Sequence, residues 1–321
     1  MVLPPLRLTS GDPVADRRAD YAQCLAESGD PAAAAELMAQ ALELVPHWPA
    51  GWFRLGELHL AAGETEAAIR AWEEVRRLDP ADKLGASVRI ELLRPVPVAE
   101  TMPSAFIRTL YDQYAPRFEA SLVDSLGYRG PEMIRDALLA EGRSQFAQVM
   151  DIGCGTGLMG AAIRPHAGWL GGCDLSPEML KRAAEKGVYD ALEVQDIAHL
   201  AVTDARFDLI TSADVFIYVG ALERVVSWAA SSLNAGGVLA FTVETLPEGL
   251  GDFRLMPSCR YAHSEAYLAR LLSEAGFAAP RMAPIVLRHD RGEPVESLIV
   301  TAVLTEARMR RQTDGEDRAT A

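Results

Sequence analysis

Residues 148–163 read QVMDIGCGTGLMGAAI, and this stretch decides the fold of the chain. Apolar residues on both sides of Asp151 predict a short buried strand. Gly153, Gly155 and Gly157 then predict a turn whose backbone can come close to a ligand. The apolar run behind this turn predicts a helix. A strand, a glycine turn and a helix in this order place backbone N–H groups beside a ligand.

Two kinds of nucleotide-binding protein carry such a turn. The dinucleotide fingerprint is G-x-G-x-x-G, which would require a glycine at position 158. Position 158 is Leu158 here, and the last glycine is Gly157. The pattern D-x-G-x-G-x-G resembles motif I of the class I S-adenosylmethionine-dependent methyltransferases. The resemblance implies that Asp151 anchors the methionine moiety of S-adenosylmethionine, directly or through water and the turn. It also implies that the turn binds this cofactor through Gly153, Cys154, Gly155 and Gly157.

The segment HAGWLGGCDLSPEML, residues 166–180, predicts a second strand that ends at Asp174. A carboxylate at this point accepts hydrogen bonds from ribose hydroxyls, a feature that dinucleotide enzymes share. Ser176, followed by Pro177, predicts the start of a helix. The resemblance implies that Asp174 and Leu175 bind the cofactor. Met179 either lines the adenine pocket or packs in the core of the helix.

A third strand is predicted within ALEVQDI, residues 191–197. In the family that the chain resembles, an acidic residue after this strand binds the adenine amino group, beside a backbone amide. The resemblance therefore assigns Gln195, Asp196 and Ile197 to the cofactor site, with Asp196 as the adenine contact. The alternative for Asp196 is a helix cap, since aspartate favours that position.

The fourth strand is predicted at residues 207–211, within RFDLITSADVF, and resembles motif IV of the same family. Ligands of open α/β sheets bind at the carboxyl ends of the strands. Ser212 is therefore expected to bind the cofactor, and Asp214 to lie beside the methyl group. A helix at residues 222–233 and a fifth strand ending at Glu244 are expected next.

In the last third of the domain, the sequence predicts a helix at residues 267–275 and then two strands, in the runs RMAPIVLR and VESLIVTAVL. An antiparallel hairpin at the end of the sheet distinguishes class I methyltransferases from the dinucleotide fold. The expected fold is therefore α/β, a Rossmann-like, mostly parallel sheet with an antiparallel terminal hairpin. An all-α tetratricopeptide-repeat domain is expected to precede it.

The repeat is visible when residues 18–46 are moved forward by 34 positions. The second copy, PAGWFRLGELHLAAGETEAAIRAWEEVRRLDP, resembles a tetratricopeptide repeat, whose period is about 34 residues. A third copy fails after a helix at residues 86–93. Two repeats and a capping helix fall short of the roughly three needed for independent stability. The region is therefore expected either to pack on the rest of the chain or on another subunit, or to form a groove for a partner.

The expected organisation has four parts. Residues 1–14 form a flexible N-terminus and residues 15–95 the repeat domain. A linker with three prolines, RPVPVAETMP, leads to the methyltransferase domain at residues 104–305. Residues 306–321 are polar and are expected to be disordered.

A helix is predicted to open the second domain at Ser104 and to end or kink at Pro116. Such a helix often covers the cofactor in the resembled family. Tyr111, Tyr114 and Phe118 are therefore candidates for cofactor contacts. The alternative is an ordinary core helix.

Composition narrows the remaining choices. The 321 residues carry a net charge of −14, which disfavours broad binding to nucleic acid phosphates. The four cysteines show no C-x-x-C pair, and no metal site is expected. The start lacks the build of a secretion signal, and no apolar run approaches the roughly 20 residues that span a bilayer. A cytoplasmic protein without membrane contact is expected.

Methyl transfer from the sulfonium is an in-line displacement, so the enzyme mainly aligns donor and acceptor. Orientation of this kind is worth about 7–11 kcal/mol. His263 lies in a segment expected to form a loop over the site, which makes it the first candidate for a general base. Tyr218 and Asp214 are the other candidate catalytic groups. The first hypothesis is methylation of a small molecule. The alternatives are a protein methyltransferase, and an interaction protein whose repeats recruit a partner while the methyltransferase fold is regulatory.

Overall fold

A computed structural model describes residues 9–93, 101–201, 203–290 and 292–305. Contacts divide the chain into two compact units, one ending at Leu110 and the other beginning at Tyr111. This division falls inside helix α6 (Ser104–Tyr114), whereas the sequence places the start of the second domain at the first residue of that helix. Most of the proline-rich linker, the first residues of the expected N-terminus and the expected tail lie outside the described residues. The two units are described separately.

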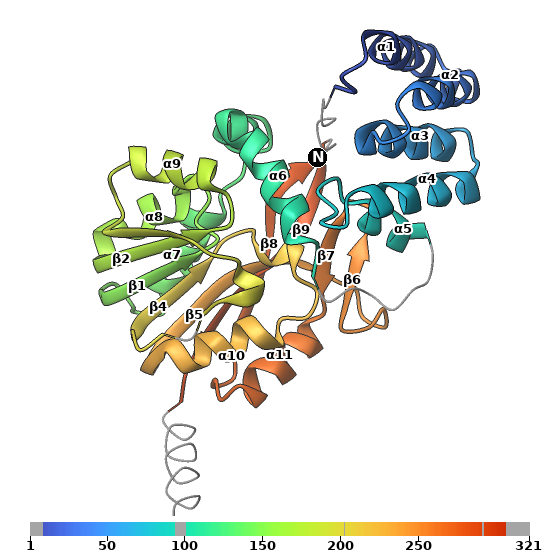
Figure 1. The fold of residues 1–321 in the computed structure, drawn as a ribbon. Coiled ribbons are helices and arrows are strands. Elements are labelled where there is room, and N and C mark those ends of the chain that lie inside the picture. The colour runs from blue at the N-terminus through green and yellow to red at the C-terminus, as the bar shows by residue number, and fades with distance from the viewer. Residues whose placement is uncertain (1–8, 94–100, 202, 291, 306–321) are drawn as a thin grey trace, which may run out of the picture. The chain divides into compact units, whose positions relative to one another are not determined.

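The first unit consists of antiparallel helical pairs (Figure 1). Its helices are α1 (Pro13–Glu27), α2 (Pro31–Leu44), α3 (Pro49–Ala61), α4 (Thr65–Leu78) and α5 (Ala86–Leu93). The first three begin with proline, which is preorganised for the first helical position. Asp12 and Asp30 cap α1 and α2 through their side chains. Both predicted helical pairs and the additional helix at residues 86–93 are present.

Close packing between α3 and α4 depends on one glycine. A Cβ atom at Gly56 would lie 2.4 Å from Nε1 of Trp72, a distance that real contacts do not reach. The Trp72 side chain is fully buried, and its indole N–H donates to the carbonyl of Phe53. The Trp72 side chain therefore occupies the space that a side chain at residue 56 would need.

The second unit is built on a nine-stranded sheet within the described residues. Its strands are β1 (Phe146–Ile152), β2 (Ala167–Asp174), β3 (Ala191–Val194), β4 (Phe207–Ser212), β5 (Leu233–Thr245), β6 (Phe253–Met256), β7 (Arg260–His263), β8 (Arg281–Asp290) and β9 (Glu293–Val303). The order is β3-β2-β1-β4-β5-β7-β6, and β9 pairs antiparallel with both β5 and β8. The first five strands are parallel to one another, as the sequence predicts, and the terminal hairpin is antiparallel.

Helices cover both faces of this sheet. One apolar core includes residues of α10 (Glu223–Ser232) and α11 (Glu265–Glu274), and the other includes residues of α7 (Gly130–Ala140) and α8 (Leu158–Ile163). Helix α9 (Pro177–Glu185) follows β2. Crossovers by helices on alternate faces bring the carboxyl ends of the parallel strands to one edge.

The structure has a hairpin of β6 and β7 where the sequence predicts a long loop. Phe253 pairs with His263, and Cys259 in the connecting turn has a φ of 56°. Four-residue strands leave too little alternation to be recognised. Strand β7 pairs with β5 at Glu244 and Thr245, beyond the last residues of β5 that pair with β4. The hairpin therefore extends the sheet at the carboxyl end of β5.

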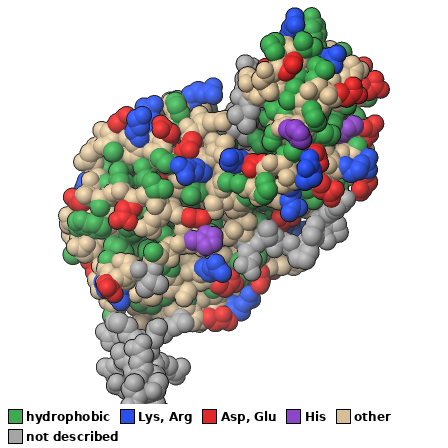
Figure 2. All heavy atoms as spheres, in the orientation of Figure 1, with side chains coloured by type: hydrophobic (Ala, Val, Ile, Leu, Met, Phe, Trp, Pro, Cys, Tyr) green, Lys and Arg blue, Asp and Glu red, His purple; other side chains and the backbone are tan. Residues whose placement is uncertain are grey.

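Basic and acidic side chains are interspersed on the face of the described residues that Figure 2 shows. No helix among the described residues is both long and apolar enough to cross a membrane.

Candidate active site

The glycine turn after β1 adopts backbone conformations that favour glycine. Gly153, Gly155 and Gly157 have φ angles of 71°, 54° and 90°. A Cβ atom at Gly153 would lie 2.5 Å from the side chain of Val215, whereas a Cβ atom at Gly155 would meet nothing within 4 Å. The first glycine therefore lets the turn pack against the segment after β4. The second leaves open space in which a ligand can approach the backbone.

Asp151 supports this turn from within the sheet. Its fully buried carboxylate accepts hydrogen bonds from the hydroxyls of Tyr189, at 2.7 Å, and Thr211, at 2.9 Å. Burial raises the pKa of Asp151 to about 6, although both hydroxyls lower it. Tyr189 in turn accepts a hydrogen bond from the backbone N–H of Gly160, at the start of α8. Asp151 thus fixes the strand and the helix that flank the turn, which fits anchoring of a ligand through the turn.

Two further residues connect the turn to its neighbours. The backbone N–H of Cys154 donates to the carbonyl of Cys173 in β2, and the thiol of Cys154 is buried. Ser212, fully buried at the end of β4, donates its hydroxyl to the carbonyl of Ile152. Of the predicted cofactor residues, Cys154 therefore lies within the glycine turn and Ser212 lies directly beside it.

Asp174 joins two backbone segments at the carboxyl edge of the sheet. One carboxylate oxygen accepts from the N–H of Gly155, at 2.9 Å, and the other from the N–H of Ser176, at 2.8 Å. Burial raises the pKa of Asp174 while these backbone hydrogen bonds lower it. Leu175 beside it is partly exposed, whereas Met179 is buried within α9. The side chain of Ser176 caps α9, as the sequence predicts.

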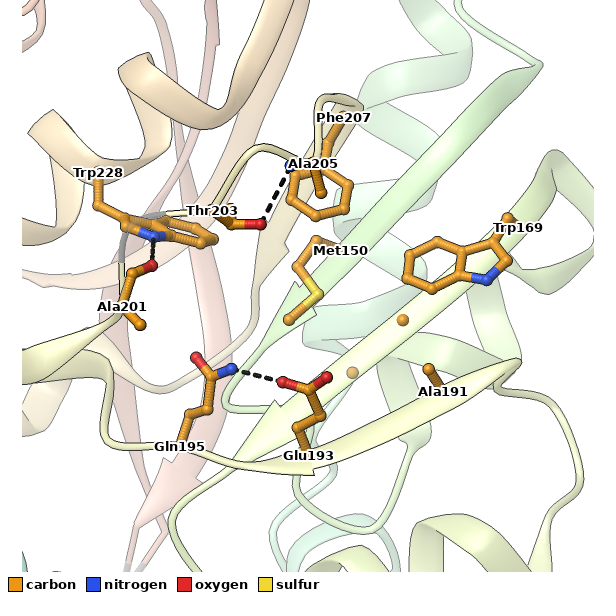
Figure 3. Close-up of a pocket in the computed structure, with 12 residues that line it drawn as sticks. Met150, Trp169, Ala191, Glu193, Gln195, Ala201, Thr203, Ala205, Phe207 and Trp228 are labelled. Atoms are coloured by element: carbon orange, nitrogen blue, oxygen red, sulfur yellow. Dashed lines mark hydrogen bonds between the residues drawn. The ribbon is translucent and has the colours of Figure 1, made fainter.

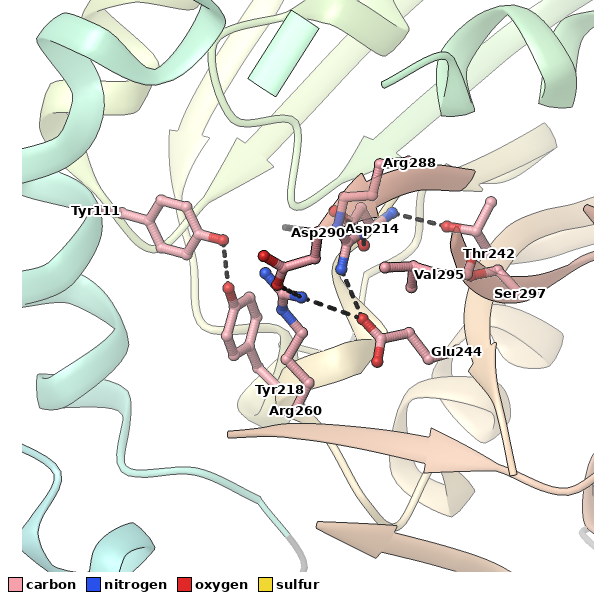
Figure 4. Close-up of polar contacts among 10 residues, drawn as sticks. All are labelled: Tyr111, Asp214, Tyr218, Thr242, Glu244, Arg260, Arg288, Asp290, Val295 and Ser297. Carbon is pink, nitrogen blue, oxygen red and sulfur yellow. Dashed lines mark hydrogen bonds and ion pairs between the residues drawn. The ribbon is translucent and has the colours of Figure 1, made fainter. Parts of the chain in front are cut away.

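The end of α6 lies along the same edge. Asp112 accepts a 2.6 Å hydrogen bond from the hydroxyl of Ser176. The hydroxyl of Tyr111 is 2.6 Å from that of Tyr218, on the other side of the edge (Figure 4). Tyr114 is buried and packs edge-to-face on Phe118, with ring centroids 5.7 Å apart. Residues 111–114 therefore connect the loop after β2 with the segment after β4.

The residues after β3 have local partners. Gln195 donates its amide to the carboxylate of Glu193 at 2.6 Å, and its backbone N–H donates to the carbonyl of Asp174. Asp196 accepts from the N–H of Ala198 at 2.9 Å and so caps the short helix η4 (Ile197–His199). The capping alternative for Asp196 is therefore realised in the structure. Ile197 is partly buried.

A cavity of about 290 Å³ lies beside these residues, on the face of the sheet that also carries α10 (Figure 3). Among its described residues, the connection from β3 to β4 contains only the single-turn helix η4, so no longer helix of that connection covers this part of the sheet. Aromatic side chains line the cavity there. The larger lining side chains are Met150, Trp169, Phe207, Trp228, Glu193 and Gln195. The predicted cofactor residue Gln195 thus lies at the rim of an aromatic cavity.

A network of buried charges occupies the carboxyl ends of β4 and β5 (Figure 4). Asp214 has a φ of 60°, and its N–H donates to the hydroxyl of Thr242. Both of its carboxylate oxygens accept from one guanidinium nitrogen of Arg288, at 2.6 and 2.7 Å. The other terminal nitrogen of Arg288 donates to Glu244 at 2.6 Å. Asp214, predicted to lie near the transferred methyl group, is thus tied to a fully buried arginine.

A second arginine completes the network. Arg260 of β7 lies 3.4 Å from a carboxylate oxygen of Glu244 and 3.8 Å from one of Asp290. The sequence does not indicate four members of this network as site residues: Glu244, Arg260, Arg288 and Asp290. Arg288 follows a short apolar run and precedes two further polar residues, His289 and Asp290, so nothing in the local sequence indicates that its side chain is buried.

His263 lies outside this network. It is fully buried in β7, and its Nε2 donates to the carbonyls of Val219 and Gly220, each at 3.0 Å. Its Nδ1 has no hydrogen-bond partner among the described residues. Burial lowers the pKa of His263 to about 4. The prediction that this residue lies in a loop over the site is wrong, and its surroundings are those of a structural histidine.

The described residues contain no group of three or more histidine, cysteine or acidic side chains that could hold a metal ion. The carboxyl edge instead offers backbone N–H groups at a glycine turn, a carboxylate at the second strand, two tyrosine hydroxyls and a charged network. This arrangement can bind a nucleoside and orient a second molecule next to it.

Comparisons with known proteins agree with both units. Residues 150–241 match a methyltransferase domain family, and residues 15–89 match a tetratricopeptide repeat family. The chain is 34% identical over 139 residues to a malonyl-[acyl-carrier protein] O-methyltransferase of Enterobacter lignolyticus, covering 42% of this chain and 55% of that protein. It is 31% identical over 98 residues to a ubiquinone biosynthesis O-methyltransferase of Coxiella burnetii, covering 29% and 42%.

The chain therefore spans about half the length of the curated relatives that it matches. Among solved structures, it is similar to a magnesium protoporphyrin IX methyltransferase from Synechocystis with bound SAH. That similarity has a TM-score of 0.44 and 20% identity, and it covers 71% of this chain and all of the other.

Proposed function

We propose that this chain, which carries a class I methyltransferase domain behind tetratricopeptide repeats, transfers a methyl group from S-adenosylmethionine to a small-molecule acceptor. The observation that carries the proposal is the position of Asp174. This carboxylate lies at the end of β2, next to a glycine turn with open space at Gly155. A carboxylate in that position suits ribose hydroxyls.

The cofactor would lie along the carboxyl edge of the sheet. Its methionine moiety would face the turn at residues 153–157, and its ribose would face Asp174. The adenine would contact the segment after β3, next to the backbone of Ile197 and the side chain of Gln195, whose amide donates to Glu193 in the structure. Leu175, Met179, Ser212, Tyr111 and Tyr114 remain predicted contacts.

The acceptor would bind on the side of Asp214 and Tyr218. The segment after β4 packs closely on the glycine turn, because a Cβ atom at Gly153 would lie 2.5 Å from the side chain of Val215. Burial raises the pKa of both Tyr111 and Tyr218, so these hydroxyls stay protonated near neutral pH and can donate hydrogen bonds. Orientation of donor and acceptor would supply most of the rate, worth about 7–11 kcal/mol.

The relatives support a small acceptor. One curated relative is named as an O-methyltransferase of malonyl-[acyl-carrier protein], and the other as an O-methyltransferase of ubiquinone biosynthesis. The methyltransferase family match covers residues 150–241, and the repeats at residues 15–89 match a separate family. Recruitment of a partner by the repeats, and a cytoplasmic location, remain predictions.

Calorimetry tests the cofactor. S-adenosylmethionine should bind the full chain, and Asp174→Ala should weaken binding by at least about tenfold through loss of charged hydrogen bonds. Asp174→Asn keeps one acceptor and should fall in between. Glu178→Ala, exposed in the first turn of α9, is the control and should bind normally. Equal affinity of the wild type and a folded Asp174→Ala variant would contradict the proposal.

A further inference from the structure

Two arginines of the charged network are held differently by their carboxylate partners. The side chain of Arg288 is fully buried, and its contacts with Asp214 and Glu244 lie between 2.6 and 2.7 Å. These are the lengths of strong, charge-assisted hydrogen bonds. Arg288 is therefore committed to two carboxylates of its own chain.

Arg260 shares Glu244 with Arg288 and has Asp290 as its second carboxylate partner, and both of its contacts are longer. Its Nη1 lies 3.4 Å from Glu244 and 3.8 Å from Asp290, whereas ordinary N–H···O hydrogen bonds span about 2.7–3.2 Å. A guanidinium carries five N–H donors in a planar fork that fits the two oxygens of a carboxylate. Arg260 therefore retains the capacity to bind a further anion in two-pronged geometry.

Asp290 is the network carboxylate that is most accessible from solvent. Its side chain is 22% exposed, compared with 10% for Glu244 and 13% for Asp214. It is the last residue of β8 and pairs with Glu293 at the tip of the terminal hairpin. In Figure 4 the guanidinium of Arg260 lies between Asp290 and the ring of Tyr218. Asp290 is therefore the carboxylate of the network that an anion entering from solvent would meet first.

We propose that the methyl acceptor carries a carboxylate, which pairs with Arg260 and takes the place of Asp290. This inference rests on the proposed function and names the chemical class of its substrate. Exchange of one carboxylate for another keeps the net charge of the network unchanged. The buried pairs of Arg288 with Asp214 and Glu244 remain intact during the exchange.

The chemistry agrees with the surroundings. A carboxylate oxygen of the acceptor would form a bond to the methyl carbon while the carbon–sulfur bond breaks. The electron pair of that bond would stay on sulfur, so the sulfonium becomes a neutral thioether and the carboxylate a neutral methyl ester. No proton moves, and the reaction therefore requires no general base. A phenol or an amine would have to lose a proton, yet His263 is bound to backbone carbonyls outside the network.

Alkali distinguishes the possible products. The full chain would be incubated with S-adenosylmethionine labelled in the methyl group and a deproteinised small-molecule extract of bacterial cells. Methyl esters release volatile labelled methanol in mild alkali, whereas methyl ethers, amines and thioethers retain the label. Release of most of the label as methanol is the expected result. Alkali-stable label would overturn the carboxylate acceptor and leave the methyltransferase proposal standing. Absence of any transfer would overturn both.

Variants test Arg260 itself. Arg260→Met should lower the transfer rate at limiting extract about 10- to 100-fold, the effect of losing a hydrogen bond to a charged group. Arg260→Lys keeps the charge and should lose less, whereas Asp290→Asn removes the competing carboxylate and should raise that rate about threefold. Arg254→Met, exposed in the neighbouring strand β6, is the matched control. Affinity for S-adenosylmethionine should stay within twofold in each variant. Equal rates in Arg260→Met and Arg254→Met would refute the role of Arg260.

Discussion

The hydroxyl groups of Tyr111 and Tyr218 lie 2.6 Å apart, although 107 positions separate the two residues in the chain. Their rings meet edge-to-face, with centroids 5.7 Å apart. Tyr218 follows β4 on the acceptor side, and Tyr111 is followed by Asp112, which accepts a hydrogen bond from Ser176 beside Asp174. One turn of α6 thus joins the predicted ribose side of the edge to the predicted acceptor side.

We expect the two tyrosines to be coupled energetically. Tyr218→Phe leaves the hydroxyl of Tyr111 without its partner, which should cost about 1 kcal/mol of unfolding free energy. Tyr111→Phe should have a similar cost, and the double variant should lose less than the sum of the two. Urea unfolding of the three variants measures this coupling. Tyr114→Phe, at a ring that packs on Phe118, is the control. Strictly additive losses would show that the contact contributes nothing.

The glycine turn offers a second test, because two of its glycines differ in surroundings. Gly153→Ala combines a left-handed backbone with a 2.5 Å clash against Val215, whereas Gly155→Ala meets open space. The backbone alone costs roughly 1–2 kcal/mol in each case. Gly153→Ala should therefore lower the unfolding free energy by more than Gly155→Ala does. Thermal unfolding and calorimetry with S-adenosylmethionine would be measured on both.

The same pair separates stability from binding. Gly155→Ala places a methyl group where a ligand would approach the backbone, so it should weaken cofactor binding more than its modest loss of stability suggests. If a folded Gly155→Ala variant binds S-adenosylmethionine as tightly as the wild type, the cofactor does not approach the turn at this point.

Local motifs made much of this structure predictable. The glycine turn, the Ser176 cap and the terminal hairpin each depend on residues close together in the sequence. The parallel strands followed from their apolar runs, and the second repeat from its period.

The charged network could not be predicted in this way. Its members come from the ends of β4, β5, β7 and β8, and pairing of the sheet alone brings them together. Arg260 lies in a short hairpin whose sequence predicts a loop, so the sequence indicates neither its strand nor its partners. The same short hairpin explains why the sequence predicts His263 in a loop, whereas the structure has it in β7.

The repeat unit allows a test independent of function. Gly56→Ala would place a methyl group within 2.4 Å of the indole of the fully buried Trp72. Overpacking of this kind costs about 1–3 kcal/mol, and the indole hydrogen bond to Phe53 would be disturbed as well. The unfolding free energy should therefore fall by that amount, as measured by circular dichroism. Ala61→Ser, exposed at the end of α3, should change it by less than about 0.5 kcal/mol.

His263 yields a prediction about pH. Burial lowers its pKa from 6.5 to about 4, so the folded protein binds the proton more weakly than the unfolded chain. The stability that the neutral imidazole contributes is complete above the unfolded pKa and is lost as the pH falls from about 6.5 toward 4. His263→Gln cannot titrate. On acidification from pH 7 to pH 5, the unfolding free energy of the wild type should therefore fall by about 2 kcal/mol relative to that of His263→Gln.

The same variant decides whether His263 takes part in catalysis. A general base contributes roughly 10²–10⁴-fold to the rate. The imidazole is buried, and its Nε2 donates to two backbone carbonyls. We therefore expect the rate of methyl transfer by His263→Gln at pH 7.5 to stay within about threefold of the wild-type rate. Loss of a general base would cause a far larger change. Transfer of the label from S-adenosylmethionine would be measured at a temperature at which both proteins are folded. A hundredfold loss in the folded variant, with cofactor affinity unchanged, would restore His263 as a base and would weaken the argument for an acceptor that has no proton to lose.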